Sequence, residues 1–340
     1  MSNSLPSPAP AAGIRNCTKP TVTRWAIFWT FSPINSALQM AGKAVIFFFT
    51  TLFAFTGCQQ SICPAGEWEK VTAGLSFPEG PSWDGKSTLY VSNCRGDWIA
   101  KIHNGVADTF LVRSEKTPIF GYTNGLLFHR GLLYACDFGT KAVLRITADK
   151  KITVLSTGTA ERPFRRPNDI AIGPDGLLYV TDPHHYDRNN PDGAVYKIDP
   201  ASGQTAIAVP NLAFPNGIAF SPDNRSLLIC ESACQRILKF SIDNAKIDPD
   251  PTTFIKLPGG DPDGIAFDKK GNLYLAHFGG AAVYIIQPDG KIAGCLKTPG
   301  GKPTNLEFGD KHLKTLYLTE VETNSVYRLK AKIQGLPLFK

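Results

Sequence analysis

The sequence predicts an all-β fold, a six-bladed β-propeller. A short motif recurs six times along the chain, and each recurrence is followed by several short apolar runs separated by turns. The 31 glycines and 26 prolines among 340 residues suit many short strands joined by turns, and they argue against a helix bundle. A two-layer sandwich would not produce six near-equal units.

Each repeat begins with one polar residue that opens the predicted innermost strand, and we call this residue the anchor. The six anchors are Glu79, Asn124, Asn168, Asn216, Asp263 and Asn305. Successive anchors are 45, 44, 48, 47 and 42 residues apart, which is the period of a four-stranded propeller blade.

The strands of each blade follow from the apolar runs. Three runs begin at or near each anchor, and a fourth follows most of them, at 109–112, 152–155, 206–209, 254–257 and 292–296. The sixth repeat has no good fourth run after Leu329. We therefore expect the N-terminal stretch Trp68–Ala73 to pair onto the last blade and to close the ring, which removes an open sheet edge.

The N-terminal region is predicted to lie outside the propeller. Ala44–Phe55 is an uncharged apolar run, shorter than a membrane span, and it ends just before Cys58 in a pattern that resembles the lipobox of bacterial lipoproteins. Met40 begins a compact signal of its own, so residues 1–39 are interpreted as lying upstream of the true start. An uncleaved anchor and a chance apolar run remain as alternatives.

The predicted organisation is therefore a leader at 1–57, a linker at 58–65 and a propeller at 66–340. Cys58 is the predicted lipidation site, so we expect an exported protein of the bacterial periplasm or cell envelope, lipid-anchored to the membrane. Outside the leader and Cys58, six cysteines remain, and their pairing cannot be read from the sequence. We expect a monomer.

The charge of the chain does not suggest a nucleic-acid partner. The formal net charge is +7, but four basic residues and no acidic ones lie in the leader, which leaves 32 − 29 = +3 for the rest. No basic run with interleaved aromatic residues is present, so neither a nucleic-acid surface nor a second contact with the membrane is expected.

The anchors predict a cation site. In a propeller the beginnings of the inner strands surround one end of the central channel, so six residues that are distant in sequence should converge there. All six carry a side-chain oxygen, and two are carboxylates that can balance a divalent charge. Oxygen donors favour Ca²⁺, with Mg²⁺, Mn²⁺ or Zn²⁺ as alternatives. Asn-Gly and Asp-Gly are also common turn formers, but that explains Glu79 poorly.

Four segments carry a resemblance to a known family. They are Phe77–Pro81, Arg166–Asp169, Phe214–Asp223 and Asp261–Gly264. The chain from Trp68 to Leu329 resembles the senescence marker protein 30, gluconolactonase and luciferin-regenerating enzyme family. The resemblance implies a six-bladed propeller that binds a divalent cation in its channel and hydrolyses lactones or related esters.

The same resemblance implies roles for individual residues. It assigns metal binding to Glu79, Asn168, Asn216 and Asp263. It assigns substrate contact to Arg166, while Asn124 and Asn305 occupy the remaining channel-facing positions and are expected to bind water or substrate.

One segment departs from the family pattern, and the roles of one loop and one histidine stay undecided. Cys136–Gly139 reads Cys-Asp-Phe-Gly where many bacterial members have Cys-Glu-His-Gly. The polar stretch Asp182–Arg188 is either a loop that shapes specificity or a solvated loop. His277 follows an inner strand and is more often a structural histidine than a catalytic one.

The sequence is compatible with three functions. In a metal-dependent lactonase, such as one acting on sugar lactones, the cation polarises the lactone carbonyl, water attacks, and Asp263 is the candidate general base. No Gly-x-Ser-x-Gly motif is present, which disfavours a serine hydrolase. The alternative is a non-catalytic propeller that binds a ligand or protein at the cell envelope. A strictosidine-synthase-like propeller fits less well, because the resemblance implies that this relative lacks the ligand set.

Overall fold

The structure is a computed structural model that describes residues 62–64, 66–115 and 119–338. The chain divides into two units, Met1–Cys58 and Gln59–Lys340, and every described residue belongs to the second. The predicted leader and the lipidation site Cys58 therefore lie outside the described residues. Within the described part, no helix is long and apolar enough to cross a membrane.

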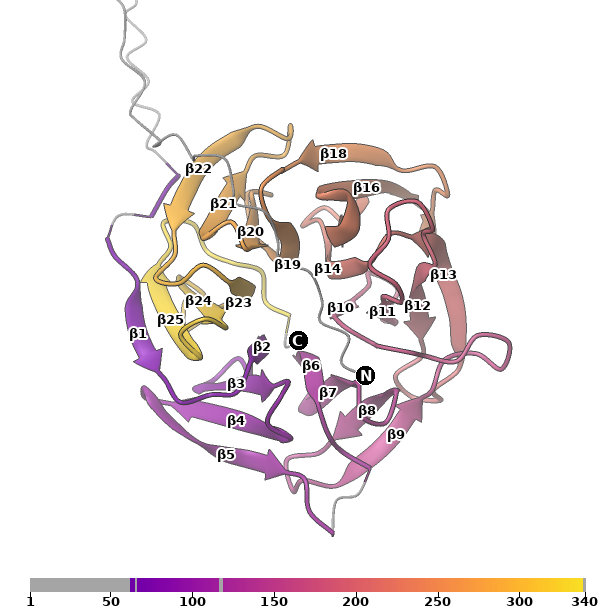
Figure 1. Cartoon of the computed structure of the whole chain (residues 1–340), viewed down its shortest axis with the longest axis horizontal. Helices are drawn as coiled ribbons and strands as arrows, with labels where there is room; N and C mark the ends of the chain where they lie inside the picture. Colours follow the sequence, from indigo (N-terminus) through magenta and orange to yellow (C-terminus); the bar gives the residue numbers. More distant parts are fainter. Residues whose placement is uncertain (1–61, 65, 116–118, 339–340) are drawn as a thin grey trace, which may run out of the picture. The chain divides into compact units, whose positions relative to one another are not determined.

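The second unit consists of six antiparallel sheets, which we call blades 1 to 6 (Figure 1). Blade 1 contains β2 (Pro78–Trp83), β3 (Thr88–Asn93), β4 (Trp98–His103) and β5 (Val106–Val112). Blade 2 contains β6 (Thr123–His129), β7 (Leu132–Asp137), β8 (Ala142–Ile146) and β9 (Ile152–Ser156). Blade 3 contains β10 (Ile170–Ile172), β11 (Leu178–Asp182), β12 (Gly193–Ile198) and β13 (Thr205–Leu212).

The other three blades repeat this order from the inner to the outer strand. Blade 4 contains β14 (Pro215–Phe220), β15 (Ser226–Glu231), β16 (Arg236–Asp243) and β18 (Thr252–Lys256), with β17 (Lys246–Ile247) as a short addition beside β16. Blade 5 contains β19 (Asp261–Phe267), β20 (Leu273–Phe278), β21 (Ala282–Ile286) and β22 (Ile292–Lys297). Blade 6 contains β23 (Pro303–Gly309), β24 (Thr315–Glu320), β25 (Ser325–Lys330) and β1 (Glu69–Thr72).

The N-terminal strand closes the last blade, as predicted. β1 pairs antiparallel with β25, and Glu69 lies opposite Arg328 in the register. The inner strands also contact one another in a closed cycle, β2–β6–β10–β14–β19–β23 and back to β2. The six-bladed propeller predicted from the repeats is confirmed.

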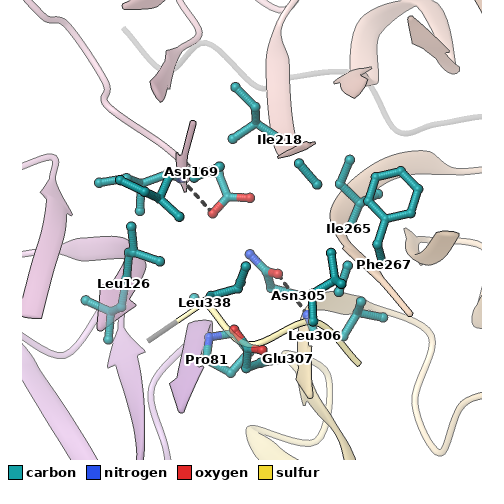
Figure 2. Close-up of a pocket in the computed structure, with 18 of the residues that line it drawn as sticks. Pro81, Leu126, Asp169, Ile218, Ile265, Phe267, Asn305, Leu306, Glu307 and Leu338 are labelled. Carbon is teal, nitrogen blue, oxygen red and sulfur yellow. Dashed lines mark hydrogen bonds between the residues drawn. The ribbon is translucent and has the colours of Figure 1, made fainter. Parts of the chain in front are cut away.

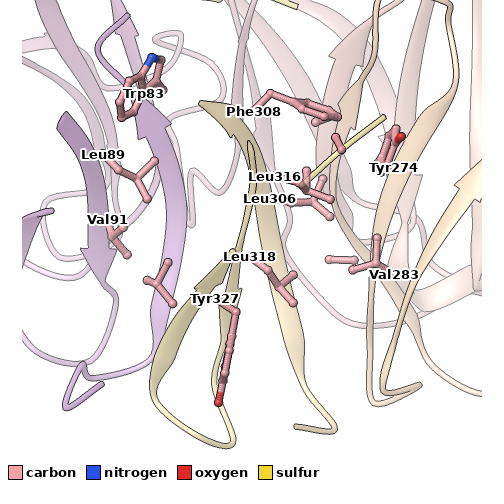
Figure 3. Close-up of a cluster of buried hydrophobic side chains, with 14 of the residues drawn as sticks. Trp83, Leu89, Val91, Tyr274, Val283, Leu306, Phe308, Leu316, Leu318 and Tyr327 are labelled. Carbon is pink, nitrogen blue, oxygen red and sulfur yellow. The ribbon is translucent and has the colours of Figure 1, made fainter. Parts of the chain in front are cut away.

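The hydrophobic core lies between neighbouring blades. In Figure 3 side chains from blades 1, 5 and 6 meet, and the Phe308 ring packs edge-on against Tyr274 with centroids 5.1 Å apart. The second strands are covered on both faces, so β11 and β15 are buried along their whole length. This explains why these strands read as continuous apolar runs rather than as alternating ones.

A β-bulge lies at or just after the anchor in five of the six inner strands. In blade 2, for example, Thr123 pairs with Asp137 and the next pair is Leu126 with Ala135, which leaves two inner-strand residues opposite one. The same shift occurs in blades 1, 4, 5 and 6. The turn interpretation of the Asn-Gly and Asp-Gly pairs is therefore wrong, since a bulge redirects these side chains.

The glycine after an anchor allows the next blade to approach closely. A Cβ built on Gly217 would lie 2.2 Å from the carbonyl oxygen of Asp263, and one on Gly80 would lie 2.3 Å from that of Asn124. Only a residue without a side chain fits between these strands. The anchor motifs thus bring the ends of neighbouring inner strands together.

Candidate functional site

Five of the six anchors line one cavity of about 600 Å³ at an end of the channel. They are Glu79, Asn124, Asn168, Asn216 and Asp263, one from each of blades 1 to 5. All five side chains except that of Asn216 are buried. The sequence-predicted metal ligands therefore share one site, as expected from the propeller.

Each of the five blades contributes three residues to the cavity, at equivalent positions of the repeat. The first is the anchor, and the second lies two residues before it. These second residues are Phe77, Tyr122, Arg166, Phe214 and Asp261. The third directly follows the second strand or, in blade 5, ends it, and these are Cys94, Phe138, Pro183, Ser232 and Phe278. The cavity therefore has an oxygen-rich floor of anchors and a wall in which five of these ten residues are aromatic.

Three of the wall aromatics have a strained backbone. Phe77, Tyr122 and Phe214 have φ angles of 55°, 60° and 56°, in the left-handed region that large side chains rarely adopt. Such conformations persist where the surrounding structure imposes them, and they cluster at ligand sites. The repetition in three blades indicates that this strain is part of how the wall is built.

The two carboxylates on the floor are electrostatically unfavourable as a pair of anions. Burial, followed by the charge of Asp169, raises the pKa of Glu79 to about 8. Burial, followed by the charge of Glu79, raises the pKa of Asp263 well above its usual range. A proton or a cation between them would relieve this cost.

The donor set fits a hard cation. Oδ1 of Asp263 is buried and has no hydrogen-bond partner among the described residues, while the Asn216 side chain donates to the Asp263 carboxylate. Glu79 accepts only a long bond, 3.3 Å, from the N–H of Gly80 within the described part. Carboxylate and amide oxygens with spare lone pairs are what Ca²⁺ prefers.

The site does not follow a histidine- or cysteine-rich metal pattern. Over the described residues, no three His, Cys, Asp or Glu side chains gather as a metal-binding group. Two of the four predicted ligands are asparagines, which such a grouping leaves out. The cavity suits an oxygen-ligated ion and not a thiolate- or imidazole-bound one.

Asn305 does not line the main cavity with the other five anchors. It lines a second, narrow cavity of about 70 Å³ with Asp169 and Glu307 (Figure 2). Its Oδ1 accepts a hydrogen bond of 2.8 Å from the N–H of Leu306. Binding of water or substrate by Asn305 therefore stays a prediction.

Asp169 and Glu307 were not predicted from the sequence. Burial raises the pKa of Asp169 to about 6, although the N–H groups of Ile170 and Ile218 and the Asn305 side chain oppose the shift. Burial also raises the pKa of Glu307 to about 8. Asp169 occupies the position that glycine holds after four of the other five anchors, and its carboxylate reaches the N–H of Ile218 in the neighbouring inner strand.

Arg166, predicted to contact substrate, lines the main cavity, and Arg95 and Tyr186 line it as well. The guanidinium of Arg95 lies 4.5 Å from the centre of the Phe77 ring, in a cation–π contact. Tyr186 comes from the polar loop after β11, which the sequence left open between a specificity role and a solvated one. Because Tyr186 lines the cavity, the structure favours the specificity role.

The structure also places His277 and the segment 136–139, which differs from the family pattern. His277 is buried, and its Nε2 lies 3.1 Å from the carbonyl oxygen of Leu257. It does not line the cavity, which agrees with a structural role. Phe138 replaces the family's histidine in the wall, and Cys136 is a fully buried thiol whose pKa burial raises.

Comparisons with known proteins agree with this fold and site. Residues 77–322 match the family profile described as the SMP-30/Gluconolactonase/LRE-like region. A gluconolactonase of Zymomonas mobilis is 29% identical over 298 residues, covering 78% of this chain and 82% of the relative. The strictosidine synthase-like protein 7 of Arabidopsis thaliana is 28% identical over 244 residues, covering 66% of this chain and 64% of that protein.

Solved structures show the same architecture. A gluconolactonase of Xanthomonas campestris superposes with a TM-score of 0.68 at 25% identity, covering 79% of this chain and 91% of that one. A calcium-binding protein of Agrobacterium tumefaciens, regucalcin, superposes with a TM-score of 0.69 at 19% identity, covering 82% and 98%. The second likeness is to the fold alone.

Proposed function

This chain belongs to the SMP-30/gluconolactonase/LRE-like family and is a hydrolase, and we propose that it opens lactone rings with the help of a divalent cation. The observation that carries the proposal is the floor of the cavity. Five oxygen-bearing anchors from five blades converge there, and a buried oxygen of Asp263 has no protein partner within the described chain.

Glu79, Asn168, Asn216 and Asp263 are the proposed cation ligands. When bound there, a divalent ion would supply electrostatic stabilisation of the negative charge that develops on the substrate oxygen. We favour Ca²⁺, because all four donors are oxygens and two are neutral amides. Regucalcin of Agrobacterium tumefaciens, a calcium-binding protein, shares the fold.

Side chains of the cavity would carry out the other steps of lactone hydrolysis. Water adds to the carbonyl carbon, the ring C–O bond breaks, and the ring oxygen becomes the hydroxyl of the hydroxy acid. Asp263 is the proposed general base, which accepts the proton of the attacking water and returns it to the ring oxygen. A bound cation would lower the pKa of this carboxylate, so the role requires that Asp263 hold the ion weakly or through one oxygen only. Arg166 lines the same cavity and would hold polar groups of the substrate.

Sugar lactones are the proposed substrates, supported by the gluconolactonases among the relatives. A panel of sugar and non-sugar lactones, followed by pH-stat with Ca²⁺, Mg²⁺, Mn²⁺ or Zn²⁺ after chelation, tests this. Cation-dependent acid release from a sugar lactone is expected. Binding of lactones without acid release under every condition would instead favour the non-catalytic ligand-binding alternative.

We also propose that the protein is exported and tethered through Cys58, as a monomer. The apolar run before Cys58 supports this proposal. Mass spectrometry of the membrane fraction is expected to find a lipid-modified N-terminal cysteine, and replacement of Cys58 by Ala should abolish that modification.

A further inference from the structure

A buried polar side chain lies at the end of the second strand of every blade. In five blades this residue is the last of the strand, and in blade 5 it is the last but one. These residues, which we call clamp residues, are Asn93, Asp137, Asp182, Glu231, His277 and Glu320. All six are at most 2% exposed. None of them lines the main cavity, so the site described above does not use them directly.

Five clamp residues make the same hydrogen bond. A side-chain oxygen accepts from the backbone N–H that lies three residues before the anchor of the same blade. The pairs are Asn93 with Ser76 at 2.8 Å, Asp137 with Gly121 at 2.8 Å, Asp182 with Arg165 at 3.1 Å, Glu231 with Ala213 at 2.8 Å and Glu320 with Lys302 at 2.9 Å.

Blade 5 varies this arrangement with an imidazole. Gly260 lies three residues before Asp263, and a Cβ added there would lie 2.9 Å from Cε1 of His277. The His277 ring therefore packs against the same point of the loop that the other clamp residues bond. The relationship between clamp and anchor loop is thus a property of the whole ring.

We propose that the clamp residues of blades 1 to 5 are positioning residues, which hold the anchor loops so that the anchor oxygens converge on one cation site. The inference rests on the proposed function in that it takes a cation as the ligand. It goes beyond that function because no clamp residue lines the cavity or is itself a proposed ligand. Partners behind the ligands commonly set their orientation, and their loss costs about 10- to 100-fold in metal affinity.

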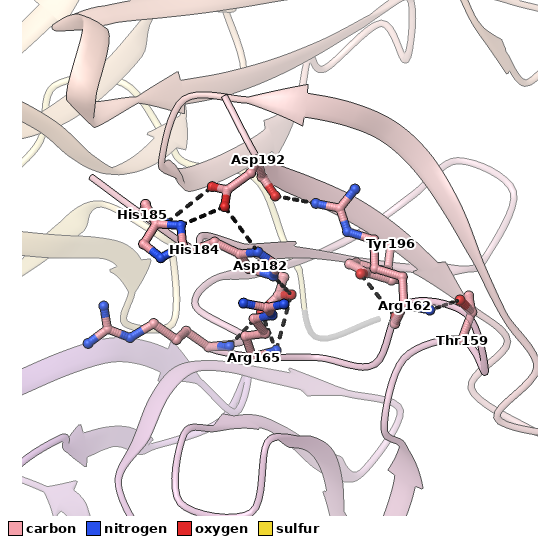
Figure 4. A network of polar contacts seen from close by, with 9 residues as sticks. Thr159, Arg162, Arg165, Asp182, His184, His185, Asp192 and Tyr196 are labelled. Atoms are coloured by element: carbon pink, nitrogen blue, oxygen red, sulfur yellow. Dashed lines mark hydrogen bonds and ion pairs between the residues drawn. The ribbon is translucent and has the colours of Figure 1, made fainter. Parts of the chain in front are cut away.

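Asp182 shows the arrangement in most detail (Figure 4). Its Oδ1 accepts from the N–H of Arg166 at 2.6 Å and from that of Arg165 at 3.1 Å. Behind it, Nε2 of His184 lies 3.4 Å from Oδ2, a looser contact than the two amide bonds. Asp182 therefore fixes the backbone of the proposed substrate-binding arginine itself.

The loop is held at its other end as well. The N–H of Asn168 donates to the carbonyl oxygen of Thr181 at 2.7 Å, one residue before Asp182. Only Pro167, with its restricted φ, lies between Arg166 and Asn168. The end of β11 thus determines where both the arginine and the anchor lie.

A buried carboxylate could also serve the fold alone, and Asp268 provides the matched control. It is as fully buried as Asp182, and its Oδ1 accepts from the N–H groups of Lys270 at 2.8 Å and Asn272 at 3.0 Å. These amides belong to the turn between β19 and β20, which carries no anchor. Removing Asp268 should therefore cost stability without moving the anchors.

The test compares Asp182→Ala, Asp182→Asn and Asp268→Ala in the full chain. Calorimetry with Ca²⁺ alone should show affinity about 10- to 100-fold weaker for Asp182→Ala. Asp268→Ala should match the wild type. Asp182→Asn should keep most of the affinity, because the side-chain oxygen of Asn93 accepts the equivalent hydrogen bond in blade 1. Equal Ca²⁺ affinity in Asp182→Ala and wild type, or equal losses in Asp182→Ala and Asp268→Ala, would overturn the proposal.

A second readout separates this proposal from the proposed function. Amide hydrogen exchange of the metal-free proteins should be faster around Arg165 and Arg166 in Asp182→Ala, and not in Asp268→Ala. If wild type bound no cation, the proposed function would fail, while unchanged exchange in Asp182→Ala would refute the positioning role. If Asp182→Ala does not fold, Asn93→Ala removes the equivalent bond beside Glu79 without changing charge, and the same outcomes apply.

Discussion

The phenolic hydroxyl of Tyr186 donates a hydrogen bond of 2.7 Å to Oδ1 of Asp261. Tyr186 belongs to the loop after β11 in blade 3, whereas Asp261 begins the inner strand of blade 5. The Tyr186 ring also packs edge-on against Phe214 of blade 4, with centroids 5.2 Å apart. One side chain therefore connects three blades across the cavity wall.

Tyr186→Phe should raise KM about 5-fold and leave kcat nearly unchanged. The lost bond is worth roughly 1 kcal/mol, because Tyr186 is 55% exposed and solvent weakens it. Steady-state kinetics on the best lactone measure this. Tyr179→Phe is the control. The Tyr179 hydroxyl donates a hydrogen bond of 2.9 Å to Asp175, and neither residue lines the cavity. Equal effects of both variants would contradict a role for Tyr186 in substrate binding.

Gly217→Ala should weaken both the fold and cation binding. The added methyl group would meet the backbone of Asp263, so β19 must shift at the anchor. Overpacking of this kind costs about 1–3 kcal/mol, which thermal unfolding and Ca²⁺ calorimetry would detect together. Gly131→Ala is the control, because a Cβ there meets nothing within 4 Å and only its φ of +80° is unfavourable. Unchanged Ca²⁺ affinity in Gly217→Ala would contradict the close approach.

Glu307→Gln should stabilise the protein more at pH 9 than at pH 5. The folded-state pKa of Glu307 is raised to about 8 from 4.5, so between these values the folded protein holds a proton that the unfolded chain has lost. Stability contributed by this group therefore falls as pH rises through that window, and it is lowest above about 8. Glutamine removes the dependence because it does not titrate.

Melting temperatures of both proteins across this pH range measure the effect. The difference should reach several degrees at pH 9, since each pKa unit corresponds to about 1.4 kcal/mol. The exposed Glu161 gives the control variant Glu161→Gln. A pH-independent difference between Glu307→Gln and wild type would show that the Glu307 carboxyl is not titrating in the narrow cavity.

The fold was predictable because every blade has the same pattern of strands and turns. Turns and apolar runs recur at nearly constant spacing, so the six blades could be counted. The missing fourth strand after Leu329 pointed to Trp68–Ala73, within which β1 (Glu69–Thr72) forms. The bulges were not predicted. A bulge depends on which residues pair across two strands, and the turn preference of Asn-Gly concealed it.

The candidate site was predictable where it follows the repeat. Glu79 and four other anchors share the cavity because they begin equivalent inner strands. Asn305 departs because its side chain turns toward Asp169 and Leu306, which no spacing reveals. The clamp residues did leave a signal, since a polar residue follows each second-strand apolar run. Recognising it required knowledge of which backbone amide each side chain meets.

The most direct test of the cation-dependent lactonase compares wild type with Asp263→Asn, each assayed for lactone hydrolysis by pH-stat after chelation and after addition of Ca²⁺. Wild type should lose activity on chelation and recover it with Ca²⁺. With Ca²⁺ present, Asp263→Asn should be at least about 100-fold slower than wild type without a lower melting temperature, because asparagine has nearly the same size but cannot accept the proton. Chelator-resistant turnover by wild type, or full activity of Asp263→Asn, would contradict the account.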